Sequence, residues 1–263
     1  MKIGNFIFCF FILSSLSLKS QILKELKNAI DIADKQKMIL QKLATEKIFF
    51  EEDKRTTESE VSINYGINEF NLGTEILKDL SPTKDLKYQI AIEELTFRMF
   101  SRLLNSNDDE ALEEILYMND LFVKICEETS QSFIKHTCKE QKLIKTIKVA
   151  GSLRYLLHRL SLYQSIHYFG IRTIYPEEIN QIITSINKRI NYLTVSEYNT
   201  FEIDEEISKT LYYWNNIKKQ LEKSKKNKAG MSMLNPEKLV DLSGVLSEKL
   251  NILPSKYIDL IQQ

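Results

Sequence analysis

The chain has 263 residues, enough for a large buried core in one or two domains. It contains only 7 glycines and 4 prolines, which favours long helices over sandwiches, barrels and glycine-rich nucleotide-binding sheets. The 36 basic residues balance the 36 acidic ones, which excludes a strongly basic nucleic-acid-binding protein and a polyanionic tail protein.

Residues 1–20 have the pattern of a secretory signal peptide. A basic start at Lys2 precedes an apolar run over residues 3–16, and Ser17 and Ser20 supply small residues for cleavage. The run is shorter than the roughly 20 residues that cross a bilayer, and no apolar run of that length follows. We therefore expect a periplasmic or secreted protein with no membrane span after cleavage; the alternative is an uncleaved anchor.

The rest of the chain is predicted to form helices separated by weak breaks. Apolar residues recur every three or four positions, as on one face of a helix. Ile92, Leu95 and Met99 belong to this pattern, whereas Gly66 and Gly73 are candidate breaks. The expected helices cover residues 21–53, 58–80, 85–104 and 109–170, begin again at 176, cover 200–223, and begin again at 235.

The two cysteines after the signal peptide, Cys126 and Cys138, are predicted to be free thiols. No glycine or proline lies between residues 105 and 150, so we expect one continuous or gently kinked helix through both. Twelve residues of helix would hold them about 18 Å apart, too far for a disulfide. If the chain instead reverses near residues 128–130, an exported protein permits the bond.

A repeat divides the chain into two parts. Residues 32–44 align without gaps with residues 149–161, so that Lys37 matches Arg154. An offset of 117 residues suggests duplication of a whole unit rather than a short solenoid repeat. We therefore expect an all-α fold of antiparallel up-and-down helices, with two four-helix units in tandem over residues 21–130 and 131–263.

Both segments resemble the signature helix of the PilJ-type periplasmic sensor domain, found at the N-terminus of type IV pili chemotaxis transducers. The first copy keeps the Ala, Gln, Met and second Gln of that signature; it replaces Gly by Asp34 and the arginines by lysines. The second copy also resembles the related box of NarX-type nitrate and nitrite sensor kinases. In that family the arginine at the position of Arg154 binds the anion. The resemblance implies a sensor that acts through a sensor kinase or chemoreceptor.

The second copy carries the candidate ligand site. Gly151, Arg154 and His158 are spaced by three and four residues, so they share one helix stripe. Glycine would let a partner backbone approach, and the planar guanidinium suits nitrate, carboxylate or phosphate. A homodimer could place two Arg154 side chains around one anion. The alternative is an arginine that extends from the edge of the core to solvent or pairs with a glutamate on another helix, and a structural histidine.

Lys37 is the corresponding cation of the first copy, and it is a weaker candidate. Asp34 lies one turn before Lys37 and is expected to offset its charge. No metal-ligand spacing, cofactor motif, nucleophile elbow or phosphate loop accompanies these residues, so an enzyme is not expected.

The expected function is that of an exported sensory module that binds a small anion such as nitrate or nitrite and acts through a partner protein. The alternative is an envelope interaction or structural protein that has no small-molecule ligand. Neither function requires nucleic acid as a partner, in keeping with the neutral charge.

Overall fold

The computed structural model describes residues 3–106, 108, 110–137, 141–223 and 234–260, with side chains except for residues 3–20 and 22. All regular structure in these residues is helical, which confirms the predicted all-α class. The helices are α1 (Ile3–Glu51), α2 (Thr56–Asp79), α3 (Lys84–Leu104), α4 (Ala111–Lys135), α5 (Gln141–Tyr168), α6 (Pro176–Thr194), α7 (Phe201–Lys223), α8 (Pro236–Leu250) and α9 (Ile252–Asp259).

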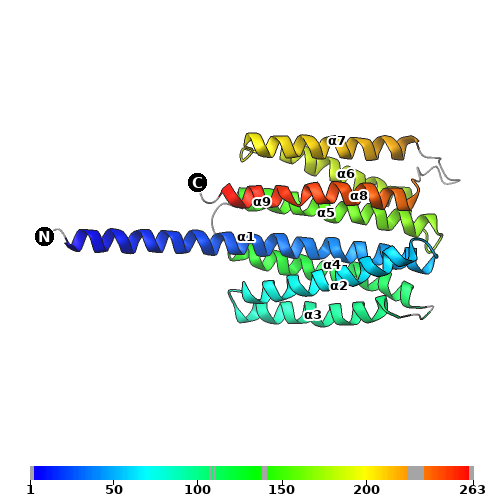
Figure 1. The fold of residues 1–263 in the computed structure, drawn as a ribbon, viewed down its shortest axis with the longest axis horizontal. Coiled ribbons are helices and arrows are strands. Elements are labelled where there is room, and N and C mark those ends of the chain that lie inside the picture. Colours follow the sequence, from blue (N-terminus) through cyan, green and yellow to red (C-terminus); the bar gives the residue numbers. More distant parts are fainter. Residues whose placement is uncertain (1–2, 107, 109, 138–140, 224–233, 261–263) are drawn as a thin grey trace.

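The helices lie side by side in a bundle, with α3 at one edge and α7 at the opposite edge (Figure 1). Helix α1 contacts α2, α4 and α5, and α3 packs on α2 and α4. Helix α5 contacts α6, α8 and α9, and α7 packs on α6, α8 and α9. Helices α1 and α5 therefore form the main contact between the two halves of the chain, and α1 also contacts α9.

The two candidate breaks in α2 are points of close packing. A Cβ atom on Gly66 would lie 2.8 Å from Leu43 Cδ2, and one on Gly73 would lie 3.3 Å from Ile32 Cγ2. The helix continues through both positions, because the missing side chains let α1 approach instead of letting the chain turn.

The expected continuous helix over residues 109–170 is wrong. Helix α4 ends at Lys135, where Thr137 Oγ1 donates a hydrogen bond to the Ile134 carbonyl at 2.7 Å, and α5 begins at Gln141. A side-chain hydroxyl thus helps to end the helix without glycine or proline. Cys126 is a buried free thiol, whereas Cys138 lies outside the described residues. The expected unit boundary at residue 130 falls inside α4.

Apolar side chains on the inward faces fill the bundle. Phe70 of α2 and Phe97 of α3 stack with ring centroids 3.8 Å apart, and Phe122 of α4 packs 5.4 Å from Phe70. In the part of the chain whose side chains are described, no helix has the length and apolar character to cross a membrane.

Candidate functional site

The two motif segments, residues 32–44 of α1 and 149–161 of α5, lie against each other. Asp34 meets Gly151, and Lys37 Nζ lies 5.9 Å from the ring centroid of Tyr155. The later residue of α1 thus contacts the later residue of α5. The two helices run parallel, side by side in the centre of the bundle (Figure 1). We call this contact the α1–α5 seam.

Gly151 is the closest approach at the seam. A Cβ atom there would lie 3.0 Å from Asp34 Oδ2 and 3.3 Å from Asp34 Cβ. Gly151 thus admits a neighbour, but the nearest atoms belong to the Asp34 side chain of the other motif segment and not to the backbone of a partner. Glycine is otherwise unfavourable in a helix interior by about 1 kcal/mol relative to alanine.

Arg154 is buried at the seam, with a relative exposure of 1%. Its Nη2 forms an ion pair with Asp31 of α1, and its Nη1 donates to Asn251 Oδ1, between α8 and α9, at 3.0 Å. The guanidinium therefore holds together three segments that are distant in sequence. The guanidinium faces α1 of its own chain, and the expected homodimeric anion site stays a prediction.

Lys37 is also buried at the seam and has two carboxylate partners. Its Nζ lies 2.5 Å from Asp34 Oδ1 and 2.5 Å from Glu127 Oε2 of α4. Glu127 also forms an ion pair with Lys148 of α5. The predicted Asp34–Lys37 pair is thus present, and Glu127 extends it to α4 and α5.

Arg189 of α6 brings a fourth cation to this region. Its Nε donates to Ser152 Oγ at 2.8 Å, next to Gly151, and its Nη1 donates to the Ser185 carbonyl at 3.3 Å. We call the following residues the charged cluster, which formally has four cations and three carboxylates: Asp31, Asp34, Lys37, Glu127, Lys148, Arg154 and Arg189.

Burial and pairing shift the pKa values of the charged cluster. Burial raises the pKa of Asp34, and the attraction of Lys37 offsets this only in part. Burial works against the charged form of Lys37, but Asp34 and Glu127 outweigh it and raise the pKa of Lys37. Burial likewise opposes ionisation of Glu127, yet Lys37 and Lys148 lower its pKa to about 2. Lys37 and Glu127 are therefore charged throughout the physiological pH range.

His158 lies on the same helix stripe and is also buried. Burial, helped by the nearby charge of Lys42, lowers the pKa of His158 to about 3. The imidazole is therefore neutral at physiological pH, where it can donate or accept one hydrogen bond but supplies no charge to an anion.

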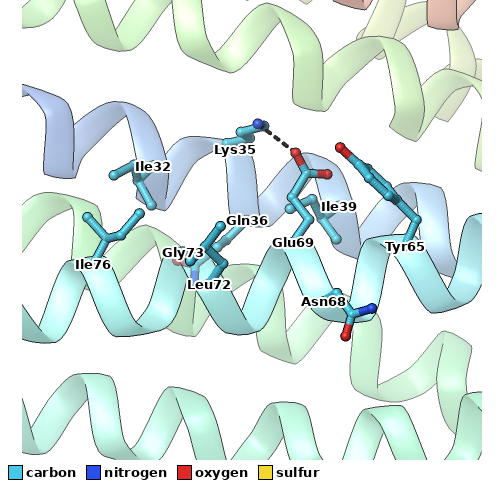
Figure 2. Close-up of a pocket in the computed structure, with 10 residues that line it drawn as sticks. All are labelled: Ile32, Lys35, Gln36, Ile39, Tyr65, Asn68, Glu69, Leu72, Gly73 and Ile76. Atoms are coloured by element: carbon cyan, nitrogen blue, oxygen red, sulfur yellow. Dashed lines mark ion pairs between the residues drawn. The ribbon is translucent and has the colours of Figure 1, made fainter.

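A groove of about 310 Å³ lies between α1 and α2, one helix away from the seam (Figure 2). The Lys35–Glu69 ion pair, 2.6 Å long, spans its rim, and Gln36 Nε2 donates to Thr74 Oγ1 at 2.9 Å at its base. Its lining is otherwise largely apolar: Ile32, Ile39, Tyr65, Asn68, Leu72, Gly73 and Ile76.

Three of the partner residues at the seam were not predicted from the sequence. Asp31 lies one turn before Asp34 on the motif helix, so a search for acids at that spacing could have found it. Glu127 and Asn251 come from other helices far along the chain, and no local spacing indicates them.

No group of three His, Cys, Asp or Glu side chains that could hold a metal ion occurs among the described residues. Comparisons with family models, curated proteins and solved structures find no match for this chain. The site must therefore be interpreted from its own chemistry.

Proposed function

We propose that this protein is an exported sensory module of the PilJ type, in which a small anion binds at the α1–α5 seam and a partner protein receives the signal. The observation that carries this proposal is the position of Lys37 and Arg154. These corresponding cations of the two motif segments lie at the same buried seam, next to the glycine that lets the helices approach. Its role is binding, not catalysis.

The helix contacts support a tandem arrangement. Helices α1 to α4 would form one four-helix unit and α5 to α9 the other, joined through their first helices. The seam would then be the intramolecular counterpart of the contact between two sensor subunits. A ligand that binds there touches both units, and a change in their relative position is a signal that a partner can detect.

Asp31 occupies the position on Arg154 that an incoming anion would take. Its carboxylate pairs with the Arg154 guanidinium, and its side chain keeps an exposure of 18%. Nitrate, nitrite and small carboxylates present the same paired oxygens to a guanidinium. The incoming anion would therefore replace Asp31 on Arg154, and Asp31 would move toward solvent. The formal excess of one cation in the charged cluster favours this exchange.

The test is a thermal-shift series with sodium nitrate, nitrite and acetate at constant ionic strength. Ligand at a hundredfold excess over Kd stabilises the folded state by about 2.7 kcal/mol. Asp31→Asn should enlarge the shift, because it removes the internal competitor. Arg154→Ala should abolish it, and Arg154→Lys should weaken it because an ammonium lacks the planar fork. Asp241→Asn, which breaks an exposed ion pair with Arg55, is the matched control and should not change it.

A second function, an envelope interaction protein with no small-molecule ligand, is favoured by the pairing itself. Arg154 and Lys37 already have carboxylate partners in the chain, and in this second function their charges would hold the helices in register. Equal thermal shifts in the wild type, Asp31→Asn and Arg154→Ala would select this function over the sensory one.

A further inference from the structure

Helix α3 is apolar on two opposite faces. Its inward face is buried in the core, as at Ile90 and Phe97. Its outward face carries a stripe of large apolar side chains that are 57–71% exposed: Tyr88, Ile92, Leu95 and Met99. Their spacing of four, three and four residues is that of a helix that packs along another helix. Single exposed apolar residues are ordinary, but four in successive turns of an edge helix mark a contact surface.

A row of basic side chains follows one flank of this stripe. Lys84, Lys87, Arg98 and Arg102 are exposed, and Asp85 is the one exposed acid of α3. At 100° per residue, the basic row lies on the flank next to α2. Glu94 on that flank confirms the direction, since it forms an ion pair with Lys78 of α2 at 2.9 Å.

Helix α2 carries the complementary surface. Its exposed charged side chains are all acidic: Glu58, Glu60, Glu75 and Asp79. Its exposed apolar side chains are Val61, Tyr65, Leu72 and Ile76. Three of these, Tyr65, Leu72 and Ile76, form one wall of the α1–α2 groove, which is open beside them (Figure 2).

We propose that two copies of this chain associate through these surfaces, with α3 of each copy packed over α2 and the α1–α2 groove of the other. A two-fold axis parallel to the helices places α3 opposite the partner's α2, so the basic row of α3 meets exposed acidic side chains in both contacts. A two-fold axis across the helices would instead place α3 on α3 and α2 on α2. Like charges would then face each other, so the charges select the first arrangement.

The apolar stripes fit the same arrangement. The stripe of α2 turns toward α1, where it borders the groove, and the stripe of α3 turns toward α4, away from its own basic row. When the two-fold axis is parallel to the helices, the apolar stripe of α3 in one copy and that of α2 in the other copy lie on the same side of the interface. The apolar side chains of α3 therefore meet the partner's groove, while the basic row of α3 meets Glu60 and Glu75, the acids that lie toward α3 on the partner's α2.

Helix α7, the edge helix on the opposite side of the bundle, provides the contrast (Figure 1). Its outward face is mainly polar, with Glu202, Glu205 and Lys209 exposed. Its two exposed aromatic residues, Phe201 and Tyr212, are eleven positions apart and do not form a stripe. Only one edge of the described bundle thus combines an apolar stripe with an ordered row of charge, and a dimer through that edge leaves the α7 edge in solvent.

The first test is the oligomeric state of the full-length protein, measured by sedimentation equilibrium. The wild type should be a dimer. Leu95→Glu should raise the dissociation constant at least about tenfold, which corresponds to about 1.4 kcal/mol. Tyr212→Glu is the matched control, because it places the same charge at an exposed apolar position of α7, and it should leave the dimer intact.

The second test distinguishes the two symmetry arrangements. Lys87→Glu/Arg102→Glu on α3 and Glu60→Lys/Glu75→Lys on α2 should each weaken the dimer, whereas the combined four-residue variant should recover it. Circular dichroism and thermal unfolding check that each variant is folded. Recovery is not expected if α3 meets α3, because reversing a row that faces itself leaves like charges opposed.

Three outcomes would overturn the proposal: a monomeric wild type, a dimer that Leu95→Glu leaves unchanged, or charge variants that show no recovery. A monomer that sediments with phosphatidylglycerol vesicles, and loses this on Leu95→Glu, would instead assign the surface to a membrane. None of these results depends on the anion at the α1–α5 seam, so this proposal and the proposed function can fail separately.

Discussion

Asp31 and Arg154 form a partly buried ion pair between positions 123 residues apart, and it lies where the two motif segments meet. The repeat in the sequence is therefore also a contact in space. Two helices with similar sequence patterns thus pack against each other inside one chain. This relationship makes the seam the part of the molecule where single substitutions are most informative.

Gly151→Ala should destabilise the protein by about 1–3 kcal/mol, the usual effect of overpacking. The new methyl group would lie 3.0 Å from Asp34 Oδ2, and Asp34 is held by Lys37. Gly244→Ala is the matched control on α8, where a Cβ atom meets open space, and it should stabilise by about 0.5–1 kcal/mol. Urea unfolding measures both, and a Gly151→Ala protein as stable as the wild type would contradict the close approach.

Lys37→Met should destabilise by about 3–5 kcal/mol, because it leaves Asp34 buried without its nearest cation. Adding Asp34→Asn should recover a large part of this loss. Lys24→Met, which breaks an exposed ion pair with Asp259, should change stability by less than about 1 kcal/mol. Chemical denaturation of the single and double variants forms the cycle, and additive losses would show that the two residues are not coupled.

Glu93 should make the protein less stable as the pH rises. Burial raises its pKa from 4.5 to about 7, although Thr129 Oγ1 donates to it at 2.6 Å. The folded state therefore holds a proton that the unfolded state has lost between these pH values. The free energy of unfolding should fall by about 3 kcal/mol across that range, since one pKa unit is about 1.4 kcal/mol.

Glu93→Gln should remove this fall and raise the stability measured at about pH 8. The comparison is the free energy of unfolding near pH 5 and near pH 8 for both proteins. Glu128→Gln, an exposed position of α4, is the control and should retain the wild-type pH dependence. A wild-type pH profile in the Glu93→Gln variant would show that another group is responsible.

Cys126 should be unreactive in the folded protein. Burial raises the pKa of its thiol well above the usual value, and the neighbouring Glu93 adds to the effect. Because the thiolate is the nucleophile, iodoacetamide should label Cys126 at least about a hundredfold more slowly in buffer than in urea. Peptide mapping by mass spectrometry follows this residue directly, and rapid labelling under native conditions would show that its site opens readily.

Periodicity and capping residues predicted most of the helices. Pro176 and the Asn235–Pro236 pair begin helices where expected, and the helices over residues 85–104 and 200–223 agree to within one residue. The end of α4 was missed, because it depends on hydrogen bonds of Thr137 and His136 that have no strong sequence signal. The apolar residues of α3 were expected on one helix face, but they lie on two: Ile90 is buried, whereas Ile92, Leu95 and Met99 are exposed.

The sequence predicted the residues that α5 contributes to the seam but not their partners on other helices. The spacing of Gly151, Arg154 and His158 correctly indicates one helix face, because helical periodicity is local. The residue that neutralises Arg154 could not be inferred from that spacing, because it depends on which helix packs there. The repeat indicates that two helices are alike, but only the tertiary contact shows that they are neighbours and that Asp31 faces the guanidinium.

The ion pair between Lys24 of α1 and Asp259 of α9 joins segments 235 residues apart. Helix α1 thus contacts a helix that is synthesised much later. Native packing of α1 cannot be complete while α9 is still being made, so this part of folding must follow translation of α9. Contacts of such sequence separation are slow to form, because a long loop must close before they contribute.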